Sequence, residues 1–238
     1  MMGSRQAGFD GGVLGRVLLA PFRVALGVLL GLAGLLLLAW TVFWLSAAHL
    51  WPNGKAGMHD LLQAEWQAGA VLVQGQGGSD SALAVPANGL YGLVFGFSGV
   101  HDMGRRFAEG APLSIPDTVA RDTYIARQNE IEVAMVGTQL LGVRAGILIR
   151  YLPLLGLLYL VGAVDGLALR AVRRIQGGRE SAGVYHRAKF MQLGLMALGG
   201  GTLLVWPWPV AWGWVAGLAA GLLCLLAAVQ WTYYKKHL

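Results

Sequence analysis

The chain has 238 residues, of which 56% are hydrophobic and only 13% are charged, and its mean hydropathy is +0.57. Soluble domains carry about 25% charged residues, so this composition excludes an ordinary soluble protein and predicts an all-α integral membrane protein. The formal net charge is +6, and the single cysteine, Cys224, excludes an internal disulfide.

Four apolar runs are close to the roughly 20 residues that a helix needs to cross a bilayer. They cover residues 24–51, 145–164, 190–206 and 210–231. The first run is longer than the apolar core of a cleaved signal peptide, so we expect an uncleaved anchor. The second contains Arg150 near its start and Pro153, which we expect to kink the helix. The sequence WPWP joins the last two runs, and its tryptophans are typical of a membrane–water interface.

Residues 52–144, between the first two runs, are expected to form a mainly helical insert outside the bilayer. Residues 58–70 have helical periodicity with one apolar face. That face consists of Met58, Leu62, Trp66 and Ala70. No glycine or proline occurs from Asp117 to Val136, so a second helix is expected to run on into the run at 145–164 as one long rod.

Residues 83–100 are also uncharged and nearly long enough to span. They contain helix-breaking or polar residues, namely Pro86, Asn88, Gly89, Gly92, Gly96 and Gly99. Counting them as a span would move the later basic loop to the outside. We therefore interpret them as a buried, re-entrant or interfacial piece of the insert.

The basic residues predict the orientation of the chain, because Lys and Arg concentrate on the cytoplasmic side. Residues 1–23, the loop 165–189 and the tail 232–238 are all basic, and the loop has six cations against two acids. Residues 52–144 have six cations and nine acids. The distribution predicts that both termini and the loop are cytoplasmic, with the insert on the other side.

Glycines at four-residue spacing predict close contacts between helices in the spans. They are Gly27 and Gly31, Gly162 and Gly166, and Gly213, Gly217 and Gly221. Chance is the competing interpretation in a chain with 36 glycines. Whether the facing helix belongs to the same chain or to another subunit stays open.

The sequence contains no recognisable catalytic, cofactor or metal motif. No two of the five histidines share a helix face at the spacing of metal ligands, and neither HExxH nor GxSxG occurs. Asp165, at the end of the second span, is a functional suspect by its place, but pairing with a loop cation is the simpler interpretation. We expect a protein that is not an enzyme and needs no cofactor or metal.

The loop between the second and third spans is the most motif-like stretch. Its charged and aromatic residues are candidates for contact with a partner: Asp165, Arg170, Arg173, Arg174, Arg179, Glu180, Tyr185, His186, Arg187 and Lys189. Three interpretations stay open: charge that sets topology and attracts anionic lipid, docking of a protein, and contact with DNA phosphates. The last has the least support, because the repeated aromatic and basic pattern of single-strand binders is missing.

Two segments of this loop carry a family resemblance. VDGLALRAVRRI (Val164–Ile175) and GRESAGVYHRAK (Gly178–Lys189) resemble inner-membrane proteins encoded by integrating conjugative elements and conjugative plasmids. The plan of one span, an external domain and three further spans agrees. The resemblance implies a bacterial inner-membrane protein, with a periplasmic insert, that acts in conjugative DNA transfer beside a type IV secretion apparatus. It also implies that the coupling ATPase is a candidate partner.

The expected function is therefore a non-catalytic subunit of a conjugative transfer machinery whose basic loop docks a partner. The alternative is a small membrane channel or transporter, for which the spans offer few polar groups. These are Arg150, Asp165, Gln192, Thr202 and a few hydroxyls. A membrane enzyme would need polar residues clustered at one interface, which the sequence does not suggest.

Overall fold

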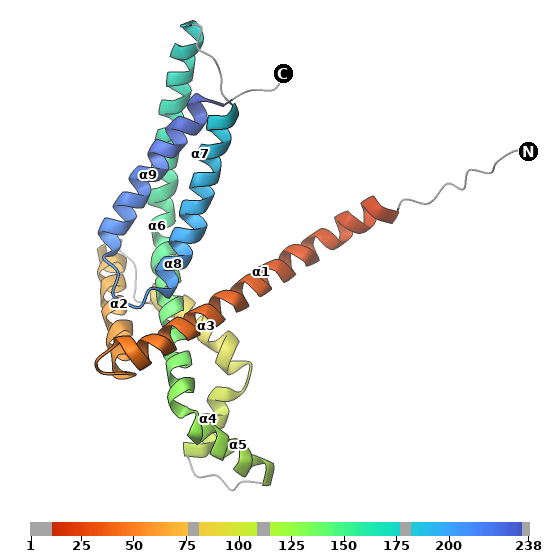
Figure 1. Ribbon diagram of the computed structural model, residues 1–238, viewed down its shortest axis with the longest axis vertical. Coiled ribbons are helices and arrows are strands. Elements are labelled where there is room, and N and C mark those ends of the chain that lie inside the picture. Colours follow the sequence, from red (N-terminus) through yellow and green to blue (C-terminus); the bar gives the residue numbers. More distant parts are fainter. Residues whose placement is uncertain (1–10, 76–80, 109–114, 177–181, 235–238) are drawn as a thin grey trace, which may run out of the picture. The chain divides into compact units, whose positions relative to one another are not determined.

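The computed structural model describes residues 11–75, 81–108, 115–176 and 182–234, and within these ranges the chain forms helices and no strands (Figure 1). In chain order they are α1 (Gly11–Leu45), the π-helical turn η1 (Ser46–Leu50), α2 (Ala56–Gly75), α3 (Ser81–Tyr91), the π-helical turn η2 (Gly92–Gly96), α4 (Val100–Ala108), α5 (Ile115–Ala126), α6 (Gln128–Ile175), α7 (Ala182–Gly194), the π-helical turn η3 (Leu195–Gly199), α8 (Gly200–Val205) and α9 (Trp212–Thr232). They belong to two compact units that meet within α1, after Leu38, and each unit is described by itself.

Four helical stretches of the described chain are long and apolar enough to cross a membrane. They are Ala20–Leu50, Gln128–Ile175, Gly183–Val205 and Trp212–Thr232. Each overlaps one of the four runs predicted from the sequence, and the third consists of α7, η3 and α8 in succession. Within the described residues, the prediction of an all-helical fold with four candidate spans is confirmed.

In the first unit the chain forms the larger part of α1. The sequence there is rich in leucine, alanine and valine, and it carries no charge after Arg23. Leucine and alanine favour helix, and a helix satisfies its own backbone hydrogen bonds, which an apolar surrounding requires. Pro21 lies in the helix without ending it.

The second unit is organised along α6, which has 48 residues and is therefore about 72 Å long at 1.5 Å per residue. The long rod is thus present, but it begins at Gln128, because the backbone at Arg127 leaves the helical conformation and separates α5 from α6. No glycine or proline marks this break in the sequence. Pro153 lies inside α6, and the helix continues through it.

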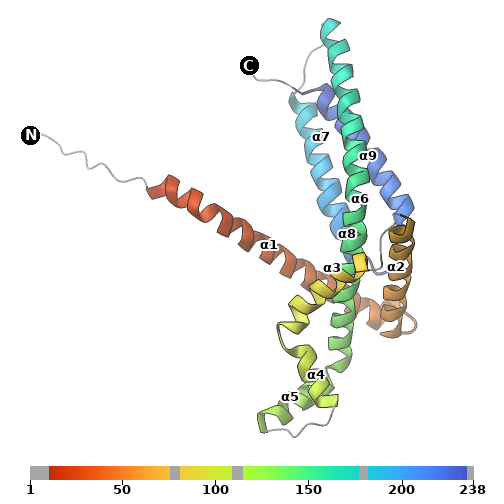
Figure 2. The same cartoon turned by 180° about the vertical axis from the view of Figure 1, so that it is seen from behind.

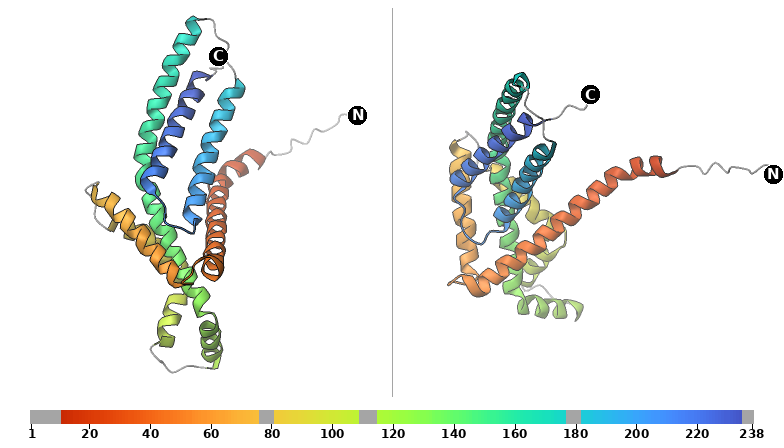
Figure 3. Two further views of the ribbon diagram at one scale, coloured as in Figure 1. Left: turned by 60° about the vertical axis from the view of Figure 1, so that its left-hand side comes forward. Right: turned by 45° about the horizontal axis from the view of Figure 1, so that its top comes forward.

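The helices α2 and α3 pack beside the first half of α6, and α9 packs beside its second half (Figures 1 and 2). Gly162 faces the α9 backbone at Cys224, and Gly166 faces it at Ala228, so the two helices run parallel. A side chain at either glycine would overlap the α9 backbone, so only glycine permits this approach. α7 packs against α9 as well and runs antiparallel to it (Figure 3).

A second pair of glycines brings α3 against α6. A Cβ atom at Gly142 would collide with the α3 backbone at Ala87, and one at Gly146 would contact Pro86. The spacing of four residues is the same as at Gly162 and Gly166, but this pair was not predicted from the sequence. This second pair of glycines lies where α3 packs on α6, so the close contact holds α3 against α6.

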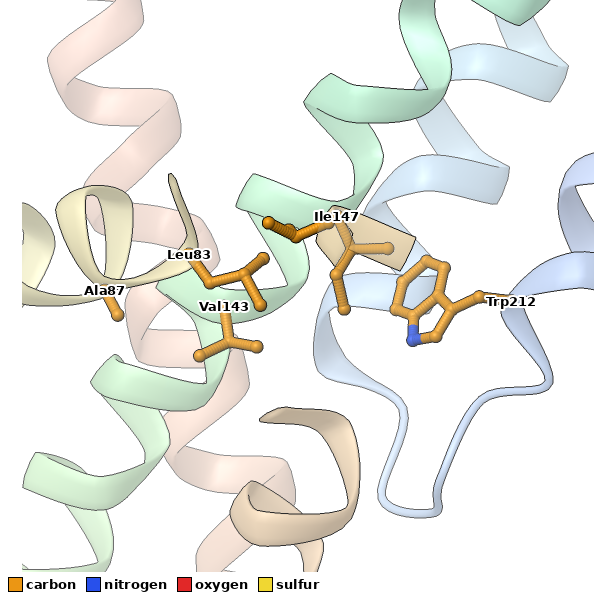
Figure 4. Packing of buried hydrophobic residues seen from close by; sticks show 6 residues of the cluster. Leu83, Ala87, Val143, Ile147 and Trp212 are labelled. Carbon is orange, nitrogen blue, oxygen red and sulfur yellow. The ribbon is translucent and has the colours of Figure 1, made fainter. Parts of the chain in front are cut away.

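The buried core of this region is formed by residues from α2, α3, α6 and the start of α9. They are Val73, Leu83, Ala87, Val143, Ile147 and Trp212, and Figure 4 shows how five of them gather. The fully buried face of α2 consists of Met58, Leu61, Glu65, Gly69 and Val73. The face predicted from the sequence is confirmed in part, because Met58 is buried and Leu62 and Trp66 are partly buried against the core. The fully buried positions differ because spacings of three and four residues alternate in a helix.

Residues 82–107 form two helical arms, Ala82–Gly96 and Val100–Phe107, bent by 75°. The bend contains Gly99 at φ +73°, a conformation that glycine adopts readily. Ala87 and Phe95 are buried in the protein, whereas Leu93 and Phe97 are 60% and 94% exposed. The segment is therefore partly buried within the protein, and whether it is a buried, re-entrant or interfacial piece stays open.

Candidate functional site

A buried ion pair joins α2 to α6. The side chains of Glu65 and Arg144 have no exposed surface, and Arg144 Nη2 lies 2.7 Å from Glu65 Oε1. Arg144 Nε donates a second hydrogen bond to the same oxygen at 3.2 Å. A buried charge without its partner is strongly destabilising, so each of these side chains depends on the other.

The guanidinium of Arg144 also binds the Trp-Pro turn between α8 and α9. Nη1 donates to the carbonyl oxygens of Leu203 (3.2 Å), Leu204 (3.3 Å) and Trp206. Nη2 donates to the carbonyl oxygen of Trp208 at 2.8 Å. One side chain from the middle of α6 thus contacts four backbone carbonyls at the end of another candidate span.

The sequence explains why these carbonyls need an external donor. The last carbonyls of any helix have no partner within the helix, and α8 ends at Val205. The residue four positions after Leu203 is Pro207, which has no N–H. Arg144 supplies the missing hydrogen bonds, because its planar group carries five N–H donors in a fixed geometry.

Glu65 is held by the segment that follows the turn. The backbone N–H of Val210 donates to Oε1 at 3.0 Å, and the indole N–H of Trp212 donates to Oε2. The indole N–H of Trp51 donates to the carbonyl of Pro207 at 3.1 Å, which adds a contact from the segment after η1. The buried pair therefore ties α2, α6 and both ends of the turn together.

This arrangement is suited to holding a structure. Both side chains are fully buried, and the carboxylate accepts four hydrogen bonds, two from Arg144, one from Val210 in the turn and one from Trp212 at the start of α9. A charge network that is this well paired rigidifies its surroundings. We call Glu65, Arg144 and the turn 206–210 the Arg–Glu clamp, and it fixes the insert helix α2 against the last two candidate spans.

Neither Glu65 nor Arg144 is among the functional residues predicted from the sequence. Two signals were present. Glu65 follows Met58 by seven residues, which places an acid on the buried face of α2, and Arg144 stands directly before a long apolar run. An acid and an arginine in apolar surroundings indicate a pair, although the sequence does not say which acid.

The residues predicted to contact a partner gather only in part. Arg179 and Glu180 lie outside the described residues. In α6, Arg170 lies over the ring of Tyr234 at 5.3 Å and Arg173 over that of Tyr233 at 4.0 Å. Tyr185 of α7 contacts the same Tyr234, with ring centroids 5.7 Å apart. The ends of α6, α7 and α9 thus meet in one cluster of cations and aromatic rings.

The other predicted contact residues surround this cluster or lie apart from it. Asp165, Arg174, His186, Arg187 and Lys189 are all exposed. His186 contacts the neighbouring Tyr185 ring, with centroids 5.3 Å apart. We call the end of the molecule formed by 165–176, 182–189 and 231–234 the basic end.

The predicted packing glycines differ in their surroundings. Gly162 and Gly166 lie against α9. On α9, Gly213, Gly217 and Gly221 are exposed, and a Cβ there would meet nothing within 4 Å among the described residues. Contact of this face with another subunit stays a prediction, as does packing at Gly27 and Gly31 in the first unit.

A metal site has no candidate in the described ranges, where no three His, Cys, Asp or Glu side chains come close enough to hold an ion. A smaller polar contact lies elsewhere: Lys55 Nζ and His59 Nε2 lie 2.8 and 3.1 Å from the carboxylate of Glu132. These side chains are about one-third to one-half exposed, so this contact contributes little stability.

Comparison with known proteins identifies the family. A family model described as IncC plasmid conjugative DNA transfer protein DtrJ-like matches residues 59–235. No curated protein and no solved structure matches the chain. The matched range begins after α1 and includes both halves of the Arg–Glu clamp and the loop that carried the resemblance. It covers well over half of the sequence, and the chain therefore belongs to the DtrJ-like family of conjugative DNA transfer proteins.

Proposed function

We propose that this chain is a non-catalytic subunit of the bacterial inner-membrane machinery that exports DNA during conjugation by type IV secretion. In this role it packs against other membrane subunits and docks a partner such as the coupling ATPase. The observation that carries the proposal is the family membership, which implies a role in conjugative DNA transfer.

Insertion into the membrane is supported by the exposure of the apolar helices. Of the most apolar windows in the four candidate spans, only 17%, 17%, 6% and 28% of the residues are buried within the chain. Apolar surfaces of this extent need lipid or another protein around them, because in water the exposed helices would associate and aggregate. The positive-inside rule then favours an orientation in which the basic end faces the cytoplasm and residues 52–144 face the periplasm.

Docking is supported by the construction of the basic end. Arg170 and Arg173 lie over tyrosine rings of α9, which places their charges against the protein. Arg174 and Arg187 are exposed beside them, on α6 and α7. Positive charges held at the end of packed helices fit an acidic surface on a cytoplasmic protein, and such complementarity gives specificity and fast association.

The test is charge reversal at the exposed positions. In cells that carry the whole transfer system, the double substitution Arg174→Glu and Arg187→Glu should lower the frequency of DNA transfer at least about tenfold, since like charges facing each other cost several kcal/mol. Arg121→Glu is the control, because it reverses another exposed cation, which lies on α5 and away from the basic end. Its transfer frequency should be that of the wild type.

Immunoblots of the membrane fraction must show equal amounts of each variant. Transfer at the wild-type frequency by the double variant would contradict docking through the basic end. If the purified protein instead carried a solute across liposome membranes in a saturable manner, the alternative function of a channel or transporter would be favoured.

A further inference from the structure

A groove of about 420 Å³ lies between α6 and α7 and over α9, away from the Arg–Glu clamp. Leu152 and Leu155 of α6, Leu193 of α7 and Met196 of η3 supply most of its apolar lining. Leu152, Leu193 and Met196 are each 44–56% exposed, so the groove opens along the side of the helices. Its volume is in the range of sites that bind small molecules.

The groove has an apolar end and a polar end, as the helix directions show. α6 and α9 run parallel and α7 runs antiparallel to them, as the contact of Tyr185 with Tyr234 requires (Figure 3). Tyr159, Lys189 and Gln230 therefore lie toward the basic end, and Leu152 and Met196 toward the other. Gln192 is on α7 one turn from Lys189 and completes the polar end.

The polar end contains two groups that the protein leaves unsatisfied. Gln192 Nε2 and Gln230 Oε1 are buried, and neither has a hydrogen-bond partner in the described part of the chain. Gln230 is only 7% exposed. Buried polar groups almost always have a partner, so a donor and an acceptor in one groove indicate a ligand that offers both. Lys189, exposed at the same end, adds a positive charge.

We propose that this groove binds one anionic phospholipid whose headgroup carries a hydroxyl, as in phosphatidylglycerol. The phosphate accepts hydrogen bonds from Lys189 and from Gln192 Nε2, and the headgroup hydroxyl donates to Gln230 Oε1. One acyl chain lies along the apolar lining toward Met196. A lipid fits better than a free phosphate, because the greater part of the groove is apolar and opens sideways along an apolar helix surface.

The proposal rests on the proposed insertion into a membrane and goes beyond it, since it names one site and one class of lipid. It also differs from general attraction of anionic lipid by the basic end. General attraction depends on the sum of the charges, whereas this site depends on one lysine and also on two uncharged glutamines.

The test is native mass spectrometry of the full-length protein in mild detergent, titrated separately with phosphatidylglycerol, phosphatidic acid, phosphatidylcholine and inorganic phosphate. We expect one phosphatidylglycerol per chain, bound about tenfold more tightly than phosphatidylcholine, since a hydrogen bond to a charged group is worth about a factor of ten or more. Phosphatidic acid, which lacks the headgroup hydroxyl, should bind with intermediate strength, and inorganic phosphate should not compete.

The variants separate the site from its surroundings. Lys189→Gln and Gln192→Leu should each lower phosphatidylglycerol binding about five- to tenfold, because each removes one donor to the phosphate. Arg187→Gln removes a cation from the same helix that does not line the groove, and its binding should be unchanged within twofold. Gln230→Leu should remove the preference for phosphatidylglycerol over phosphatidic acid. If Gln230→Leu does not fold, Lys189→Gln still tests the site.

Equal binding of phosphatidylglycerol and phosphatidylcholine would overturn the proposal, and so would an equal loss in Arg187→Gln and Lys189→Gln. A photo-crosslinker at Met196 that captures another membrane protein in cells would overturn it too, because a helix would then fill the groove. None of these results depends on DNA transfer. Failure of the lipid site and failure of docking through Arg174 and Arg187 are therefore distinguishable.

Discussion

The substitution Arg144→Met tests the Arg–Glu clamp most severely. Methionine fills a similar apolar volume but leaves the Glu65 carboxylate buried without its countercharge. It also removes the donors that reach Leu203, Leu204, Trp206 and Trp208. The variant therefore loses both a buried ion pair and the hydrogen bonds at the end of α8.

The magnitude follows from these two losses. Breaking a buried ion pair costs about 3–5 kcal/mol, and each carbonyl left buried without a donor costs about 1–3 kcal/mol more. Arg144→Met should then lose more than about 5 kcal/mol, which is comparable with the whole stability of many proteins. Glu65→Gln should lose about 3–5 kcal/mol, since it keeps an oxygen that can accept from Val210.

The double substitution Glu65→Leu and Arg144→Met separates the two contributions. Replacing both members of a buried pair with apolar residues is often neutral. Here we expect only partial recovery, because Pro207, four positions after Leu203, has no N–H, and the Leu203 carbonyl would still lack a donor. Arg144→Lys should be intermediate, since a lysine keeps the charge but has three donors and no planar fork.

The assay is thermal unfolding in mild detergent, followed by tryptophan fluorescence. For a chain of this size about 1 kcal/mol shifts the midpoint by about 2–4 °C, so Glu65→Gln should lower it by about 6–20 °C. Lys55→Met breaks an exposed ion pair with Glu132 and is the control, with a shift below about 4 °C. An unchanged midpoint in Arg144→Met, or full recovery in the double variant, would show that the Arg–Glu clamp does not stabilise the protein in this way.

Three further substitutions test the packing. Gly162→Leu should force α6 and α9 apart and lower the unfolding midpoint. Gly217→Leu, on the exposed face of α9, is the control and should leave the midpoint unchanged. Equal shifts in the two variants would show that the α6–α9 contact is wrong. Gly142→Leu should displace α3 and make residues 82–107 more sensitive to protease in detergent than in the wild type, and unaltered sensitivity would contradict that contact. Thr138→Val should cost about 1 kcal/mol, because it removes the 3.0 Å hydrogen bond from the Trp40 indole, and a stability equal to the wild type would show that this bond contributes nothing.

The candidate membrane spans could be predicted from the sequence, because they follow from local amino-acid composition. Runs without charge were long enough to identify four candidate spans, and the motif in the loop between the second and third spans indicated the family. The family followed from the loop between Val164 and Lys189, which lies within the range that the family model matches. These features are local, so a single sequence contains them.

What could not be predicted depends on pairs of residues far apart in the chain. Glu65 and Arg144 are 79 positions apart, and Arg144 and Trp208 are 64 apart. Either charge taken alone has an ordinary interpretation at the surface of an insert. The buried face of α2 includes Glu65 for the same reason, since a buried carboxylate at this position is favourable only when Arg144 faces it.

The orientation that docking requires can be measured by labelling single cysteines in intact spheroplasts with a maleimide that cannot cross the membrane. With Cys224 replaced by alanine, one variant carries Lys55→Cys in the insert and the other Arg187→Cys at the basic end. We expect Lys55→Cys to be labelled at once and Arg187→Cys to be labelled only after the membrane is opened. Labelling of Arg187→Cys in intact spheroplasts would place the basic end outside the cell, where no cytoplasmic partner could dock, and would contradict the account.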